Sequence, residues 1–244
     1  MATCSSLPVA VLYADDQLIV VDKPAGQVVH PTYKNGNDTL LDSLRQELPD
    51  PPSIVGRLDK WTSGVVVVAR DSAAHAALQR EMAAPDCRKD YLAVAHGFAG
   101  DEIEIDLRLR VDERDRRRVA ASVERGASCI TRVTPVATTN LNGCVVSLLA
   151  CRLLTGRRHQ IRAHLAARGW PIVRDPIYGD VGLDRALEEL NAAMRLPARQ
   201  ALHAWRLDMN QPVTGARLTV SSPVPADLEP LVRAFGIRAG AFAS

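Results

Sequence analysis

One carboxylate in this chain, Asp59, lies in a short polar segment whose neighbours are suited to chemistry. Arg57 precedes it by two residues, and Thr62 and Ser63 follow it. A nearby cation favours the ionised carboxylate, which can attack the anomeric carbon of a sugar. Glycosidases need a second carboxylate as acid, and none is evident nearby. A lone Asp suits a reaction that breaks and remakes one bond, although an Arg-x-Asp loop is also compatible with a structural salt bridge.

A second reactive segment runs from Thr155 to Leu165 and contains Arg157, Arg158, His159 and Arg162. We expect a helix over Gly156–Ala167, whose N-terminus would attract phosphate with help from the first two arginines. His159 and His164 are five residues apart, or about 140° around a helix, whereas a two-histidine metal site needs a spacing of four. The pattern therefore predicts no metal site, and a solvated basic helix stays open as an alternative.

Two further groups of residues have types that suit a nucleic-acid site. Lys89 and Tyr91 begin an expected strand, where the Tyr ring could stack on a base or simply be half-buried. Six arginines between residues 108 and 118 alternate with acidic residues. We expect residues 101–118 to form a mobile, charged excursion, acting either as an RNA-backbone clamp or as a solvated loop.

The elements that must position these residues are short strands and helices in mixed order, without a βαβ rhythm. Alternating or continuous apolar runs predict strands at 9–13, 17–21, 54–57, 65–70, 91–95, 127–136, 145–153, 201–207 and 216–221. Helical spacing and caps predict helices near 39–48, 72–84, 156–167, 185–194 and 226–235. The fold class is therefore α+β with a mostly antiparallel sheet.

Composition indicates an ordinary globular protein rather than a membrane or secreted one. The 244 residues are 47% hydrophobic and 24% charged, with a net charge of only +2. Val65–Ala69, the longest apolar run in the middle of the chain, is far too short to cross a bilayer, and the N-terminus does not have the pattern of a secretion signal. Five cysteines without a C-x-x-C pair favour reduced thiols in the cytoplasm over disulfides or zinc. Arginines outnumber lysines 26 to 4, which favours phosphate contacts or reflects genome composition.

Four spaced patterns together resemble the RluA-type pseudouridine synthases. Arg57–Gly64 is similar to the family motif His-Arg-Leu-Asp-x-x-Thr-Ser-Gly, with Gly56 in place of the leading His. Lys89-x-Tyr91 resembles its Lys-x-Tyr, and Gly156–His164 its Gly-Arg-x-His-Gln-Ile-Arg-x-His. Lys23–Gly26 is similar to its early Lys-Pro-x-Gly turn. The resemblance runs from about residue 10 to about 225.

The resemblance implies a pseudouridine synthase core, in which a curved, mostly antiparallel mixed sheet with flanking helices surrounds a central RNA-binding cleft. It implies one catalytic domain over 1–244, with a core at about 9–236 and no separate RNA-binding domain. The catalytic residues would be Asp59, Tyr91 and Arg162, the last paired with Asp59. The RNA-binding residues would be Arg57, Arg157, Arg158, His159 and Lys89.

The implied activity is isomerisation of a specific uridine in rRNA or tRNA, after the base flips out of its helix. Asp59 would act as nucleophile, as sugar-activating carboxylate or by abstracting a proton from the sugar. We expect no metal and no organic cofactor, an RNA partner, no membrane and a monomer. Two rival functions are an RNA-binding protein that has lost catalysis and a glycosylase that releases free base.

Overall fold

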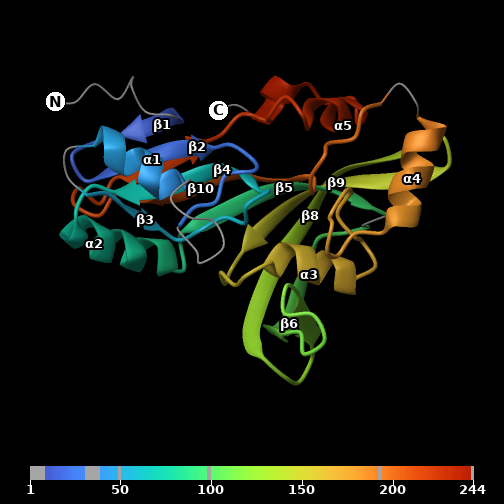
Figure 1. The fold of residues 1–244 in the computed structure, drawn as a ribbon, viewed down its shortest axis with the longest axis horizontal. Helices are drawn as coiled ribbons and strands as arrows, with labels where there is room; N and C mark the ends of the chain where they lie inside the picture. Colours follow the sequence, from blue (N-terminus) through green and yellow to red (C-terminus); the bar gives the residue numbers. More distant parts are fainter. Residues whose placement is uncertain (1–8, 31–38, 49–50, 98–99, 192–193, 243–244) are drawn as a thin grey trace. The chain divides into compact units, whose positions relative to one another are not determined.

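The computed structural model describes residues 9–30, 39–48, 51–97, 100–191 and 194–242 (Figure 1). The chain divides into two compact units. Of the described residues, those up to 89 and those at 204–223 form the first unit, and those at 90–203 and 224–242 form the second. The expected single domain stays a prediction. No described helix is both long and apolar enough to cross a membrane.

The first unit is organised around an antiparallel sheet that two helices cover. Its strands are β1 (Ala10–Ala14), β2 (Leu18–Lys23), β3 (Ser53–Val55), β4 (Ser63–Ala69), the 204–210 part of β10 (Leu202–Asn210), and β11 (Arg217–Ser221). β2 pairs with β1 and β4, β3 pairs with β4, and β10 pairs with β11. The helices are α1 (Leu40–Glu47) and α2 (Ser72–Ala83).

The continuous apolar runs of β2 and β4 exist because both faces of these strands are buried. Ile19 and Val21 pack in a cluster with Leu40 and Leu44 of α1. Leu18 and Val20 pack in another cluster with Ala74 and Leu78 of α2. Because successive side chains point to opposite faces of a strand, the two helices cover opposite sides of the sheet. This core fixes the end of β3 and the start of β4, which are joined by the loop that contains Asp59.

The second unit is an antiparallel sheet in the order β5-β9-β8-β6-β7. Its strands are β5 (Arg88–His96), β6 (Ile103–Val111), β7 (Val119–Ser122), β8 (Ala127–Leu141) and β9 (Cys144–Leu153). Helix α3 (Gln160–Ala167) packs on β6, β7 and β8, and α4 (Val181–Leu190) packs on β9. Helix α5 (Glu229–Arg233) and a short 3-10 helix at Ala239–Phe242 follow.

The α+β class with mostly antiparallel strands is confirmed, and two local expectations are wrong. Residues 103–111 form strand β6, paired with both β7 and β8, rather than an excursion. Ile105 and Leu109 are buried along one face of this strand. Helix α3 begins at Gln160 rather than at Gly156, because His159 before it is left-handed with a φ of 55°.

Smaller differences affect the C-terminal helices. Helix α4 spans 181–190 rather than 185–194, because Asp180 caps it by accepting hydrogen bonds from the backbone N–H groups of Gly182 and Leu183. Helix α5 spans only 229–233 within the expected 226–235.

Candidate active site

Asp59 lies on a tight loop that joins β3 to β4 in the first unit. The loop starts at Gly56, whose φ of 81° is a backbone conformation that glycine adopts without strain. Thr62 closes the turn by donating its backbone N–H to the Asp59 carbonyl at 3.0 Å. Asp59 is half-buried, while Thr62 and Ser63 are buried where β4 begins. The carboxylate therefore stands on a turn that is fixed at both ends and still partly open to solvent.

A buried ammonium group fastens this loop to the end of β2. The Nζ of Lys23 donates to the carbonyls of Pro24 at 2.8 Å, Gln27 at 2.9 Å and Lys60 at 3.2 Å. The backbone N–H of Gly26 also donates to the Lys60 carbonyl, at 2.9 Å. Lys60 directly follows Asp59, so these two hydrogen bonds fix the peptide beside the carboxylate. The sequence relates Lys23–Gly26 to a family turn, but it does not reveal the role of the Lys23 ammonium group.

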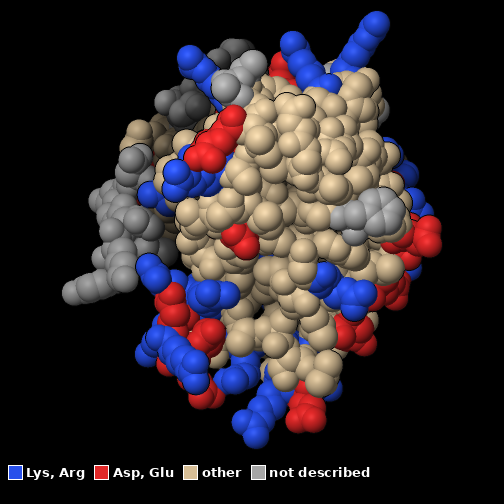
Figure 2. Space-filling model, turned by 90° about the vertical axis from the view of Figure 1, so that its right-hand side faces the viewer, with Lys and Arg blue, Asp and Glu red and all other residues tan. Residues whose placement is uncertain are grey.

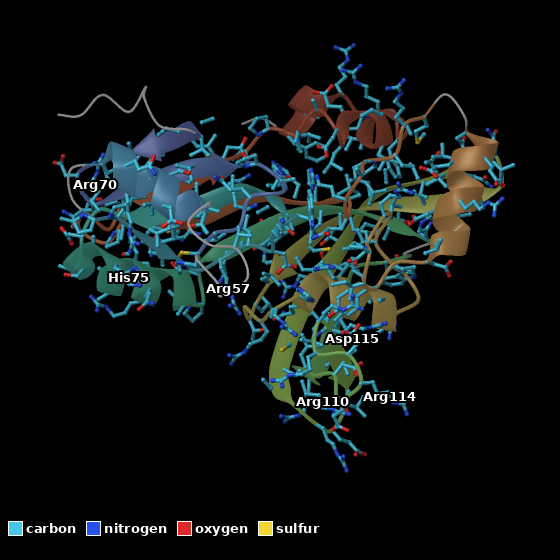
Figure 3. The ribbon with its side chains drawn as sticks, in the orientation of Figure 1. Arg57, Arg70, His75, Arg110, Arg114 and Asp115 are labelled. Carbon is cyan, nitrogen blue, oxygen red and sulfur yellow. The ribbon has the colours of Figure 1, made fainter. Side chains whose placement is uncertain are left out.

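The other candidate cations in the first unit make fewer hydrogen bonds than Lys23 does. Arg57 is exposed (Figure 3). Lys89 is half-buried, and its Nζ donates to the Met82 carbonyl at 2.9 Å, which anchors the strand to the end of α2. Lys60, also exposed, has its Nζ 5.3 Å from the centre of the Trp61 ring. Arg57 and Lys60 are thus both exposed cations close to Asp59 in the sequence.

In the second unit, Arg162 is buried and held by a bidentate ion pair with Asp175. Its Nε and Nη2 lie 2.6 and 2.8 Å from the two Asp175 oxygens. Burial raises the pKa of Asp175, but the hydrogen bonds and charge of Arg162 and two backbone amides outweigh it, so the pKa is lowered. One Asp175 oxygen accepts those amides, from Ile177 and Tyr178. Asp175 and Tyr178 lie in a stretch for which no helix or strand is predicted from the sequence, and both were missed.

The remaining candidates of this unit lie on β5 and on the turn before α3. Tyr91 is half-buried and paired with Cys151 of β9. Arg157 is exposed, whereas Arg158 donates to the carbonyls of Arg116 and Arg118. His159 Nδ1 lies 3.0 Å from the Tyr178 hydroxyl.

The eight candidates thus fall in both units. Arg57, Asp59 and Lys89 belong to the first, and the second contains Tyr91, Arg157, Arg158, His159 and Arg162. Pairing of Arg162 with Asp59 stays a prediction. Among the described residues, no group of three or more His, Cys, Asp or Glu side chains is placed to hold a metal ion.

Comparisons with known proteins agree with the motifs. The family model described as RNA pseudouridylate synthase matches residues 17–167. The chain is 40% identical to ribosomal large subunit pseudouridine synthase D of Xanthomonas campestris, over 96% of the chain and 71% of that protein. It is 38% identical to the protein of the same name from Nitrosomonas europaea, over 94% and 66%. The chain thus spans about two thirds of the length of these relatives.

Solved structures give the same result. Human RNA pseudouridylate synthase domain containing 1 matches with a TM-score of 0.70 and 25% identity, over 91% of this chain and 86% of that one. Human RNA pseudouridylate synthase domain containing 4 matches with a TM-score of 0.67, over 94% of both chains. At 23% identity, the second match concerns the fold alone.

Proposed function

The chain belongs to the RNA pseudouridylate synthase family, and on this premise we propose that it isomerises a uridine of large-subunit ribosomal RNA to pseudouridine. The ribosomal substrate is supported by the names of relatives that are up to 40% identical. Transfer RNA is the alternative substrate. The cytoplasm, where such RNA is found, is the proposed location, and the enzyme would act there as a monomer with one catalytic domain.

The main structural support for this proposal is that hydrogen bonds fix the turn that contains Asp59. Its peptide neighbour Lys60 accepts hydrogen bonds from Lys23 and Gly26. A catalytic carboxylate must be held in one geometry relative to the sugar, because small displacements cost large factors in rate. The carboxylate is half-buried, so a nucleotide can reach it.

The other candidates would serve the flipped nucleotide and its backbone. The Tyr91 ring suits stacking on an extruded pyrimidine. The buried Arg162 would supply a fixed positive charge at the reaction centre. Arg57, Arg157, Arg158, His159 and Lys89 would contact RNA, and of these Arg57 and Arg157 are the exposed arginines. The reaction would need no metal or organic cofactor, since the base detaches, rotates and rejoins through carbon.

Asp59→Asn tests this proposal. The variant should fold and bind RNA normally, while pseudouridine formed in an in vitro transcript of large-subunit rRNA falls to background in nucleoside mass spectrometry. The matched control is Asp16→Asn, which neutralises an exposed carboxylate of the same unit and should keep normal activity.

Three outcomes would contradict the proposal. Substantial product from Asp59→Asn would remove Asp59 from the chemistry. Release of free uracil by the unaltered protein would identify a glycosylase. Binding of RNA without product, on both rRNA and bulk tRNA, would indicate an RNA-binding protein that lacks catalysis.

A further inference from the structure

One buried side chain of the second unit, Tyr178, contacts both the β6–β7 hairpin and the segment that carries Arg162. Its hydroxyl accepts the backbone N–H of Val119, the first residue of β7, at 2.7 Å. The same oxygen lies 3.0 Å from Nδ1 of His159, the residue before α3. Burial raises the pKa of Tyr178, so the hydroxyl keeps its proton and can donate it to His159. The phenol therefore bridges the two elements.

The ring of Tyr178 makes a second connection between the same elements. The guanidinium carbon of Arg118, at the end of the hairpin loop, lies 5.2 Å from the ring centre. The guanidinium carbon of Arg162 also lies 5.2 Å from it. Both distances are within the range of cation–π attraction. One aromatic ring thus positions a cation of the hairpin and the candidate catalytic cation together.

Each end of this connection is held by further bonds. On the hairpin side, Arg158 donates to the carbonyls of Arg116 and Arg118 at 2.9 and 3.0 Å. On the other side, Asp175 pairs with Arg162 and accepts the backbone N–H of Tyr178 at 3.0 Å. A displacement of the loop would therefore be passed to Tyr178 and Arg162 rather than absorbed between them.

The hairpin loop also has cations available for a polyanion. Arg114 and Arg116 are exposed, and within the described residues no carboxylate forms an ion pair with either one. Figure 3 shows Arg110, Arg114 and Asp115 on this hairpin. Phosphate groups bound there would act on the same loop that Tyr178 and Arg158 hold.

We propose that Tyr178 is a positioning residue that couples RNA bound at the β6–β7 hairpin to the orientation of Arg162. The inference rests on the proposed function. RNA bound to the loop would fix the positions of Arg118, Tyr178 and Arg162 relative to one another. The chemical step would therefore be fast only when RNA is bound at the hairpin. A purely structural Tyr178 would stabilise the unit without linking these two events.

Tyr178→Phe separates the two possibilities, because it keeps the ring but removes the hydroxyl that binds Val119 and His159. With saturating large-subunit rRNA transcript, we expect the single-turnover rate to fall about tenfold while the Kd for RNA changes less than twofold. Tyr13→Phe is the matched control, since it removes a hydroxyl that donates to Asp15 in the first unit, and it should leave the rate unchanged. Arg118→Ala breaks the ring contact from the exposed hairpin side and should also lower the rate.

The decisive comparison uses a variant in which residues 112–118 are replaced by an Asn-Gly turn. In this background the coupling is already absent, so Tyr178→Phe should have no further effect on the rate. An equal loss in both backgrounds, or an unchanged rate in Tyr178→Phe, would overturn the proposal.

A readout without catalysis keeps this result separate from the proposed function. RNA stem-loop fragments of the transcript should shift the ¹⁵N resonance of Arg162 Nε in the unaltered protein, but not in Tyr178→Phe. The resonance is assigned by its loss in Arg162→Lys. If the unaltered protein makes no pseudouridine, this shift still tests the coupling, and its persistence in Tyr178→Phe would contradict it.

Discussion

Two buried cations, Lys23 in the first unit and Arg162 in the second, are each held by hydrogen bonds within their own unit. Burying a charge is costly unless hydrogen bonds or an opposite charge compensate it. Lys23 is compensated by three backbone carbonyls, and Arg162 by the two oxygens of Asp175. Each cation therefore has a structural role that the sequence alone did not reveal, since its partners are chosen by the fold.

Lys23→Met should destabilise the protein and slow the reaction. The change removes three hydrogen bonds from a charged donor, so the carbonyls of Pro24, Gln27 and Lys60 lose this partner. Hydrogen bonds to charged groups contribute about 1.5–3 kcal/mol each, so we expect a loss of at least about 3 kcal/mol in urea unfolding. The exposed Lys60→Met is the control and should change stability by less than about 1 kcal/mol. Equal stability of the two variants would show that Lys23 does not hold the loop.

Asp175→Asn should remove the carboxylate that forms the bidentate ion pair with buried Arg162. Breaking a buried pair by changing one partner costs about 3–5 kcal/mol, measured by urea unfolding at pH 7. Because the pKa of Asp175 is lowered in the folded state, the pair stabilises fully above the unfolded pKa of about 4. This stability is lost as the pH falls through the folded-state pKa, so the variant should lose less stability in acid than the unaltered protein. Parallel acid profiles would contradict the assignment.

At the scale of elements, most strands and helices follow from local patterns, and the failures have physical reasons. Residues 103–111 alternate apolar and charged side chains, which is typical of a half-buried strand. From the sequence we instead expect a mobile, charged loop here, because the segment contains many charged residues. The start of α3 was misplaced because Gln160 organises the preceding turn, accepting the Thr155 hydroxyl and the Arg157 backbone N–H. The spacing of apolar residues along the sequence does not reveal such side-chain contacts.

The packing of α3 against β6 should be sensitive to acid through His164. This side chain is fully buried, and among the described residues its ring nitrogens have no hydrogen-bond partner of normal geometry. Burial lowers the pKa of His164, more than the Leu107 carbonyl and the Asp106 charge raise it. At pH values below the unfolded-state pKa of about 6.5, the unfolded chain therefore takes up a proton more readily than the folded chain does. The folded state loses stability as a result.

His164→Leu should accordingly flatten the loss of stability between pH 7 and pH 5, while stability at pH 7 stays the same or rises. Thermal unfolding at both pH values measures this. His75→Leu, which alters a half-buried histidine bonded to Ser53, is the matched control for the substitution itself. A slope unchanged by His164→Leu would show that this histidine takes up a proton equally in the folded and unfolded states, which would contradict the prediction.

At the scale of the whole molecule, the sequence predicts which reaction the chain carries out better than it predicts the long-range contacts that hold the candidate residues in place. Asp59, Tyr91 and Arg162 were proposed from motifs, because reactive residue types and their spacing are local. Lys23 and Lys60 are 37 residues apart, and Arg162 and Asp175 are 13 apart. These contacts depend on how strands and turns meet, which no single segment determines.

The nearly balanced charge of the molecule makes RNA binding depend on a few local cations. There are 30 basic and 28 acidic residues, and Figure 2 shows both signs interspersed on the face it presents. Two of the hairpin arginines are also neutralised, since Arg110 pairs with Glu113 and Arg117 with Asp115. Affinity should therefore follow the number of unpaired arginines rather than the net charge.

Replacing Arg114 and Arg116 together by Ala tests this view. Each lost phosphate contact lowers the slope of log affinity against log salt by about 0.7–0.9, so the slope should flatten by about 1.4–1.8. The matched control, Arg110→Gln with Glu113→Gln, removes an ion pair of the same hairpin without changing net charge, and it should leave the slope unchanged. Filter binding of the rRNA transcript from 50 to 300 mM salt measures both. If the control flattens the slope as much as the Arg114 and Arg116 double variant, paired arginines also bind RNA, and the argument from unpaired cations fails.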